Sequence, residues 1–231
     1  MQWIEHPDFQ TLTTTVARSL ASACAEGIEQ RGRATLALAG GSTPMPVYRQ
    51  LAAHPLEWRS VSLMPGDERW VTHDHPACNL RAIREAFAGS NPEFKSLTPE
   101  NPDGEPSLDA ASAALSDLNL PFDACVLGMG GDGHFASLFP GAPELEYALN
   151  PEGEALATIV HPDPMPEDAP FARISLTLAA IAASRRLMLL IRGERKREVL
   201  KNATGSGLWT EFPVAALLTQ PHLPLEIHWS P

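Results

Sequence analysis

The stretch Asp123-Ala-Cys-Val-Leu-Gly-Met-Gly-Gly-Asp-Gly-His134 joins a short apolar run to a glycine-rich loop. The run predicts a strand over residues 123–128 that is apolar on both faces, because its hydrophobic residues follow one another without alternation. Strands of this kind occur in parallel sheets that helices cover on both sides. Such sheets bind their ligands at the carboxyl ends of the strands. The loop after this strand is therefore the first place where we expect a functional site.

The same alternation of apolar runs and helical segments extends along the chain in both directions. Leu12, Val16 and Leu20 recur at helical spacing in a predicted helix over 10–30, and Gly32 is placed to end it. Further strands are predicted near residues 34–39, 60–64, 155–160, 172–176, 186–191 and 225–229. Further helices are predicted near residues 44–53, 77–88, 107–118, 177–184, 194–203 and 211–219, with a surface loop over 89–107. This order predicts one α/β domain over residues 1–231 with a parallel sheet.

The composition excludes several classes of partner. The 231 residues include 17 Lys and Arg against 28 Asp and Glu, which gives a net charge of −11. So acidic a chain has no overall attraction for nucleic acid or for an anionic membrane surface. The three cysteines show no paired spacing, which favours a reducing compartment, and we expect Cys125 to be buried. The sequence has no signal peptide and no membrane-spanning run, so we expect a cytoplasmic protein.

Two loops after predicted strands suit the binding of an anion. In Ala39–Pro44 the glycines allow close approach to a ligand, Thr43 suits an N-cap, and Pro44 suits the first helical position. Free amides at the start of that helix attract anions, although a capped turn without a ligand would use the same residues. In Met64–Trp70 three charged residues follow a buried strand, and Arg69 could grip a phosphate. A solvated turn is the alternative for this second loop.

The loop 128–134 carries the residues best suited to catalysis. Its glycines satisfy G-x-G-x-x-G, the dinucleotide-binding pattern, but Pro140 would end the long helix that this pattern requires. A carboxylate at Asp132 would also repel pyrophosphate. His134 suits a general base, because the reference pKa of histidine is about 6.5, and Asp132 could orient it. A purely structural role for His134 is the alternative.

A fourth loop, Arg192–Lys196, offers another helix start with several cations. Lys196 could point into the same crevice, or these residues could form a solvated basic face. The chain has no G-x-S-x-G elbow and no G-x-x-x-x-G-K-[ST] loop, which argues against a serine hydrolase of that type and against an NTPase. The spacing of His73-Asp74-His75 matches no defined metal site, and Asp74 is better placed to cap the next helix. We therefore expect no metal at these residues.

Together these four loops resemble the 6-phosphogluconolactonase family, hydrolases of the pentose phosphate pathway. The family shows Gly-Gly-Ser-Thr-Pro, Asp-Glu-Arg, Leu-Gly-Met-Gly-x-Asp-Gly-His-x-Ala-Ser-Leu-Phe-Pro and a late Gly-x-x-Lys, which occur here in that order across residues 39–196. The resemblance implies a Rossmann-like, mostly parallel, three-layer sheet with helices on both faces, as in sugar-phosphate isomerases. It also implies hydrolysis of 6-phospho-D-glucono-1,5-lactone by water that His134 activates, without a cofactor.

The resemblance further implies the residues that contact the substrate. His134 and Asp132 fall at the catalytic positions. Contacts to phosphate or sugar are expected from Gly41, Ser42, Thr43, Asp67, Arg69, Asn79, Gly130, Arg173 and Lys196. Three neighbouring positions depart from the usual family residues, namely Cys78, Phe135 and Arg192. Because the chain is acidic and the substrate is an anion, we expect Arg69, Arg173 and Lys196 to create a positive pocket in a negative surface.

Two other functions remain open at this point. Glucosamine-6-phosphate deaminases share the fold and the Gly-x-Asp-Gly-His loop, but that family continues with a glutamate, whereas residues 135–140 contain no carboxylate here. That family also has a tyrosine at the position of Arg69. A non-catalytic sugar-phosphate sensor is the third candidate, although a sensor has no need of a base. The sequence is compatible with a monomer or a homodimer.

Overall fold

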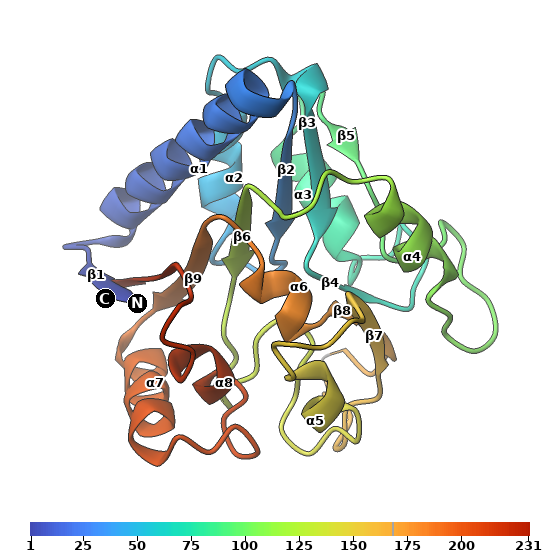
Figure 1. Cartoon of the computed structure of the whole chain (residues 1–231), viewed down its shortest axis with the longest axis vertical. Coiled ribbons are helices and arrows are strands. Elements are labelled where there is room, and N and C mark those ends of the chain that lie inside the picture. Colours follow the sequence, from blue (N-terminus) through green and yellow to red (C-terminus); the bar gives the residue numbers. More distant parts are fainter. Residues whose placement is uncertain (168) are drawn as a thin grey trace.

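A seven-stranded parallel sheet forms the centre of the molecule. The computed structural model describes residues 1–167 and 169–231. The strand order is β1 (Gln2–Glu5), β10 (Leu225–Ser230), β9 (Leu187–Arg192), β6 (Ala124–Leu127), β2 (Ala34–Leu38), β3 (Val61–Pro65) and β5 (Glu93–Phe94) (Figure 1). Every neighbouring pair in this sheet is parallel. The predicted fold class, a mostly parallel sheet between helices, is confirmed.

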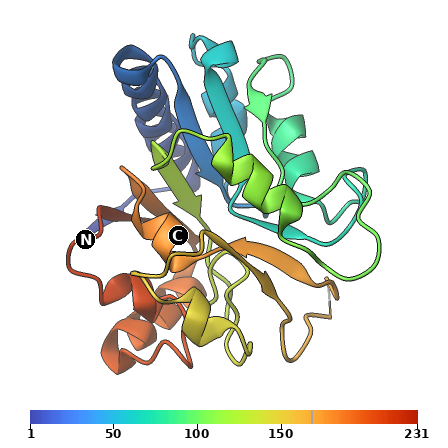
Figure 2. The same cartoon turned by 45° about the vertical axis from the view of Figure 1, so that its right-hand side comes forward.

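Helices cover both faces of this sheet and create two buried apolar clusters. One cluster holds side chains of α1 (Phe9–Arg31), α2 (Met45–Ala52) and α3 (Asn79–Ala86). The other holds side chains of α4 (Asp109–Ser116), α5 (Leu145–Ala148), α6 (Leu178–Ala182), α7 (Glu194–Ser206) and α8 (Ala215–Leu218) (Figures 1 and 2). Successive residues of a strand divide between the clusters, so Leu189 packs into the second and Leu190 into the first. This division explains why the strands are continuously apolar.

The strands predicted near 155–160 and 172–176 form, but they do not lie in the parallel sheet. They are β7 (Ala157–Val160) and β8 (Arg173–Leu176), which pair with each other in antiparallel fashion, and β8 pairs in the same way with β4 (Asp67–Arg69) on its other side. The chain leaves the main sheet at Gly66, whose carbonyl accepts the amide of Leu176 at 2.9 Å. This second sheet brings residues 67–69 and 173 together in space, although they are far apart in the sequence.

Two predicted helix caps are wrong, while one helix end is confirmed. Gly32 ends α1 in the left-handed conformation at φ 76°, as predicted. Thr43 does not cap α2, because that helix begins at Met45 after Pro44. Asp74 does not cap α3, because its carboxylate accepts a hydrogen bond from the Thr72 hydroxyl instead. No helix in the part of the chain that the structure describes is long and apolar enough to cross a membrane.

Several further elements are not predicted from the sequence, because they are too short to show a periodic pattern. They include β1, β4, β5, α5 and the short 3-10 helix η1 (Trp58–Ser60). The segment 89–107, which we expected to be a surface loop, contains β5 and the buried residue Leu97. Cys125 is fully buried, as predicted.

A buried carboxylate holds the start of α3. Glu68 is fully buried and accepts backbone N–H bonds from Arg69 at 2.9 Å and from Asn79 and Leu80 at 2.8 Å each. Burial raises the pKa of Glu68, and these backbone hydrogen bonds oppose that rise. The same carboxylate accepts the Cys78 thiol at 3.4 Å, while the Cys78 sulfur accepts the amide of Arg81 at 3.4 Å. Cys78 is therefore the N-cap of α3, in the place where serine is usual.

Replacing Cys78 tests this cap. Cys78→Ser keeps both hydrogen bonds and Cys78→Ala removes both, so the serine variant should be more stable by about 1 kcal/mol in urea unfolding. Cys24 is the matched control, because it is fully buried in the middle of α1. There alanine should be more stable than serine, since alanine favours the helix and buries no hydroxyl. The same ranking of serine and alanine at both positions would contradict the capping role.

Candidate active site

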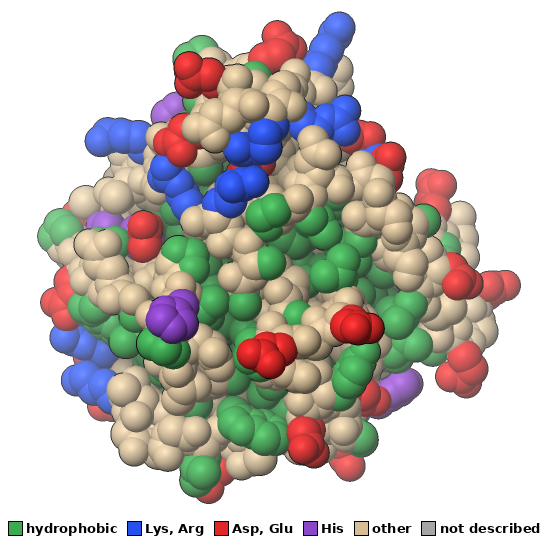
Figure 3. Space-filling model, viewed as in Figure 1, with side chains coloured by type: hydrophobic (Ala, Val, Ile, Leu, Met, Phe, Trp, Pro, Cys, Tyr) green, Lys and Arg blue, Asp and Glu red, His purple; other side chains and the backbone are tan. Residues whose placement is uncertain are grey.

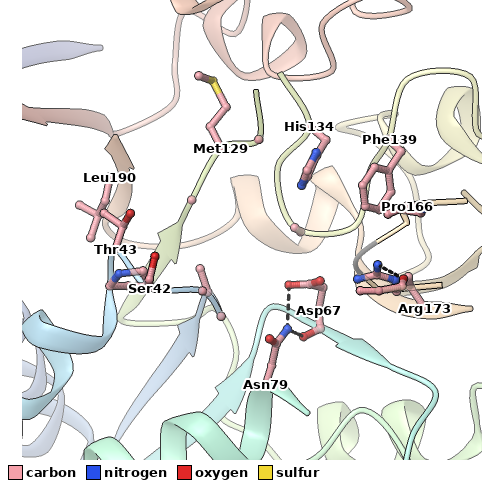
Figure 4. A pocket seen from close by; sticks show the side chains of 18 of the residues that line it. Ser42, Thr43, Asp67, Asn79, Met129, His134, Phe139, Pro166, Arg173 and Leu190 are labelled. Carbon is pink, nitrogen blue, oxygen red and sulfur yellow. Dashed lines mark hydrogen bonds between the residues drawn. The ribbon is translucent and has the colours of Figure 1, made fainter. Parts of the chain in front are cut away.

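A cavity of about 370 Å³ opens where the direction of strand order reverses, between β2 and β6. The chain runs from β2 outward to β3 and β5, and later returns to β6 and runs outward to β9 and β10 on the other side. The loops after β2 and β6 therefore diverge and leave a crevice at the carboxyl edge of the sheet. All four predicted loops contribute to its wall, together with β8 and the residues before it (Figure 4).

The structure brings the predicted site residues together. The cavity is lined by Gly41, Ser42, Thr43, Asp67, Arg69, Asn79, Gly130, His134, Arg173 and Lys196. Asp132 does not line the cavity, but its carboxylate is hydrogen-bonded to the imidazole of His134, which does. In Figure 4, Ser42 and Thr43 lie at one side of the cavity and Arg173 at the other, with His134 and Asp67 between them. The contacts that these residues make with a ligand remain a prediction.

The imidazole of His134 is held by Asp132. The distance between His134 Nδ1 and Asp132 Oδ1 is 2.6 Å, and the same oxygen accepts the His134 amide at 3.1 Å. Burial raises the pKa of Asp132, but the hydrogen bonds and charge of His134 outweigh this and hold that pKa below its ordinary value. An ionised Asp132 accepts a hydrogen bond from the Nδ1–H of His134, and in that tautomer the free lone pair of the imidazole is on Nε2. A histidine in this state can take a proton from a molecule in the cavity.

Gly130 provides the space that this pair occupies. A Cβ atom at Gly130 would lie 2.2 Å from His134 Nδ1 and 2.5 Å from Asp132 Oδ1. The neighbouring Gly131 is different, because its nearest contact would be the end of the flexible Arg195 side chain at 3.4 Å. The loop is also closed by its own backbone, since the Gly130 amide donates to the His134 carbonyl at 2.8 Å. Gly130 thus shapes the site through its missing side chain.

On the opposite wall, Asn79 joins three parts of the site. Its amide nitrogen donates to the Asp67 carbonyl at 2.7 Å, and its amide oxygen accepts from Arg69 Nη1 at 3.0 Å. Asn79 also packs against Gly40, where a Cβ atom would lie 1.9 Å from the Asn79 oxygen. The loop after β2 therefore touches the loop that carries Arg69. Asp67 is further fixed by the hydroxyl of Ser137, which donates to it.

The residues that line the cavity carry a net positive charge, although the net charge of the whole chain is negative. Three lining residues are cations, while Asp67 is the one acidic residue among the described lining residues. Arg69 Nε is buried and has no acceptor in the described part of the chain. Burial lowers the pKa of Lys196, and the charge of Asp132 partly restores it. By contrast, Asp and Glu side chains are scattered over much of the outer surface that Figure 3 shows.

The three departures from the family pattern leave the cavity lining intact. Cys78 serves as the cap of α3, Phe135 is fully buried in the core, and the Arg192 guanidinium lies 4.6 Å from the centre of the Phe9 ring. None of the three lines the cavity.

Sequence reasoning missed the side chains that support the site. Phe139 lines the cavity, and Ser175 accepts the amide of Ser137 at 3.2 Å. Ala136 adopts a positive φ of 47° in the turn between Phe135 and Leu138, an uncommon conformation for a residue other than glycine. Phe139 belongs to the quoted motif, but an apolar residue there gives no signal that separates the site from the core.

The residues His73, Asp74 and His75 do not form a metal site. His73 Nε2 lies 3.0 Å from the Ser96 hydroxyl and 3.3 Å from that of Thr98. Within residues 1–167 and 169–231, no group of three or more His, Cys, Asp or Glu side chains is arranged to hold a metal ion.

Comparisons with known proteins identify the family. Residues 7–229 match the family model described as glucosamine-6-phosphate isomerases/6-phosphogluconolactonase. A 6-phosphogluconolactonase from Rhizobium meliloti (strain 1021) is 33% identical, covering 100% of this chain and 98% of the relative. One from Pseudomonas putida is 34% identical, covering 98% and 92%.

Solved structures agree with this result. A 6-phosphogluconolactonase from Shewanella baltica OS155 has a TM-score of 0.92 and 35% identity, covering 100% of this chain and 98% of the other. A monomeric glucosamine-6-phosphate deaminase has a TM-score of 0.75 at 22% identity, a likeness of fold alone, covering 100% of this chain and 97% of the other. The chain therefore belongs to the glucosamine-6-phosphate isomerase/6-phosphogluconolactonase family.

Proposed function

We propose that the protein hydrolyses 6-phospho-D-glucono-1,5-lactone to 6-phosphogluconate, with His134 as the general base. The observation that carries this proposal is the imidazole of His134, fixed at 2.6 Å by Asp132 and facing a cavity lined by three cations. Full-length relatives named 6-phosphogluconolactonase at 33% and 34% identity support the choice of substrate. A phosphorylated lactone needs both features, a base for the ester and positive charge for the phosphate.

The geometry favours one orientation of the substrate. The loop after β2 offers backbone amides and the hydroxyls of Ser42 and Thr43, and it adjoins Arg69 through Asn79. We place the phosphate there, because backbone amides and the guanidinium of a lining arginine suit a dianion. The lactone ring then spans the cavity toward His134. The phosphate binds away from the reacting carbon, so the free energy of phosphate binding serves to hold the ester in position next to the base.

The reaction requires one proton acceptor that later becomes a donor. His134 Nε2 takes a proton from water as the water oxygen bonds to the lactone carbonyl carbon. The carbonyl oxygen becomes an oxyanion, which the positive charge of the cavity stabilises. The bond from this carbon to the ring oxygen then breaks, and the imidazolium returns its proton to the ring oxygen. Asp132 holds the imidazole and stabilises its charged form throughout.

The proposed reaction also implies a metabolic pathway and a cellular compartment. The substrate is the product of oxidation of a hexose 6-phosphate at its first carbon, which places the reaction in the oxidative pentose phosphate pathway. The three cysteines are buried and free, which suits a reducing, cytoplasmic location. We propose that residues 1–231 act as a single catalytic domain, as a monomer or a homodimer and without a cofactor.

A direct assay tests the function. The lactone is generated in place by enzymatic oxidation of glucose 6-phosphate, and its disappearance is followed above the spontaneous rate. Glucosamine 6-phosphate is tested in parallel for release of ammonia, the reaction of the deaminases in the same family. We expect lactone hydrolysis without deamination, because residues 135–140 supply no carboxylate to the site. Deamination, or no acceleration of lactone loss, would refute the proposal.

Removing the base should affect turnover far more than binding. For His134→Ala we expect kcat to fall roughly 100- to 10,000-fold while KM stays nearly unchanged, since the imidazole acts on water and not on the phosphate. The exposed His222 lies outside the cavity lining, so His222→Ala is the matched control and should match the wild type. A His134→Ala enzyme with a near-normal rate would exclude the proposed base.

Filling the space beside the base should have a similar effect. Gly130→Ala would place a methyl group within 2.2 Å of the imidazole, so we expect displacement of His134 and a loss of kcat of about 100-fold. Gly131→Ala makes the same chemical change one residue later, where the nearest contact is 3.4 Å away. That control should keep activity within a few fold. Equal activities of the two variants would show that the clearance at residue 130 does not matter.

The role of Arg69 can be separated from general damage by a second substrate. Loss of a hydrogen-bonded cation should cost about 2 kcal/mol, so Arg69→Ala should reduce kcat/KM for the phosphorylated lactone roughly 30-fold. For unphosphorylated glucono-1,5-lactone, kcat/KM should change little. Arg59→Ala, at an exposed position outside the cavity lining, controls for loss of charge. An equal loss with both substrates would contradict phosphate recognition by Arg69.

A further inference from the structure

The ring of Phe139 lies against both the imidazole of His134 and the guanidinium of Arg173. The centres of the Phe139 and His134 rings are 4.3 Å apart, with 36° between their planes. The Arg173 Cζ atom lies over the Phe139 ring, 5.5 Å from its centre. All three residues line the cavity, and Phe139 is 8% exposed (Figure 4). The Phe139 side chain therefore contacts both the proposed base, His134, and the cation Arg173.

Hydrogen bonds alone leave the imidazole with freedom to move. Asp132 holds Nδ1, but a single bond at one ring atom permits rotation about that bond and tilting of the ring. A flat neighbour in contact with the ring removes this freedom, because displacement would lose dispersion contacts on one side. On the other side, Arg173 is held by the carbonyls of Phe171 and Ala169, which accept its Nε at 3.0 Å and its Nη2 at 2.8 Å.

We infer that Phe139 is a positioning residue for the reaction: its ring sets the tilt of the His134 imidazole and the spacing between that base and the Arg173 cation. This inference rests on the proposed function of His134. It gives the apolar residue of the Ser-Leu-Phe-Pro segment a role beyond packing. The ring touches neither the reacting carbon nor the water in this account, so its effect passes through His134 and Arg173.

Packing in the core is the competing explanation, and the two make different predictions. Phe139 belongs to the second apolar cluster, so any smaller residue will also lower stability. Phe122 belongs to the same cluster, is fully buried and precedes β6 at the end of that strand opposite the cavity. Phe122→Leu therefore makes the same loss of ring and volume without touching the site. It is the matched control.

Kinetics at a temperature where every variant is folded provide the first measurement. We expect Phe139→Leu to lower kcat roughly 10- to 100-fold with KM within a few fold, because a misplaced base slows chemistry more than it weakens binding. Phe139→Tyr keeps the flat ring and should restore kcat to within a few fold of the wild type. Phe122→Leu should keep both constants. A Phe139→Leu enzyme with wild-type kcat, or one that Tyr does not surpass, would overturn the inference.

An NMR measurement without substrate separates this inference from the proposed function. The imidazole C–H signals of His134, assigned from their loss in His134→Gln, should show an upfield shift from the Phe139 ring. That shift should be lost in Phe139→Leu and kept in Phe139→Tyr and Phe122→Leu. An unchanged His134 signal in Phe139→Leu would refute the contact itself. Failure of the wild type to hydrolyse the lactone, with these shifts present, would refute the function and leave the contact standing.

Discussion

Strand β2 pairs on one side with β3 and on the other with β6, and the site depends on this double pairing. Leu36 is in register with Leu63 of β3 and with Ala124 of β6. Since both pairings are parallel, all three strands end at the same edge, while their following loops turn away from each other. The crevice between those loops receives the anion-binding turn after β2 and the histidine loop after β6. A slip of either register would separate the two halves of the site.

Charged groups beneath the cavity are stabilised by a small set of donors. Glu68 and Asp67 are buried, and their oxygens accept bonds from the start of α3, from Asn79 and from Ser137. Burying carboxylates without such bonds would be costly. The carboxylate oxygens of Asp67 and Glu68 accept hydrogen bonds from other groups of the protein. These two residues can therefore lie near the cavity without competing with an anionic ligand for its cations. A chain of net charge −11 can in this way present a cationic cavity.

Long periodic segments and the four loops could be predicted from the sequence, because each rests on local chemistry. The helix over 10–30 and the strand over 123–128 follow from the spacing of apolar residues, and the loops follow from glycines beside charged residues. The separation of β7 and β8 from the parallel sheet could not be predicted, since it depends on a contact between Gly66 and Leu176 that no local pattern encodes. The cap by Cys78 and the contact of Phe139 with His134 are likewise products of tertiary packing.

The orientation of the substrate is the central claim, and a crystal structure with bound 6-phosphogluconate tests it most directly. The product keeps the phosphate and carries its carboxylate at the carbon that reacted. We predict the phosphate against Ser42, Thr43 and Arg69, and a carboxylate oxygen about 3 Å from His134 Nε2. A phosphate beside His134, or a product bound outside the cavity between β2 and β6, would contradict the account.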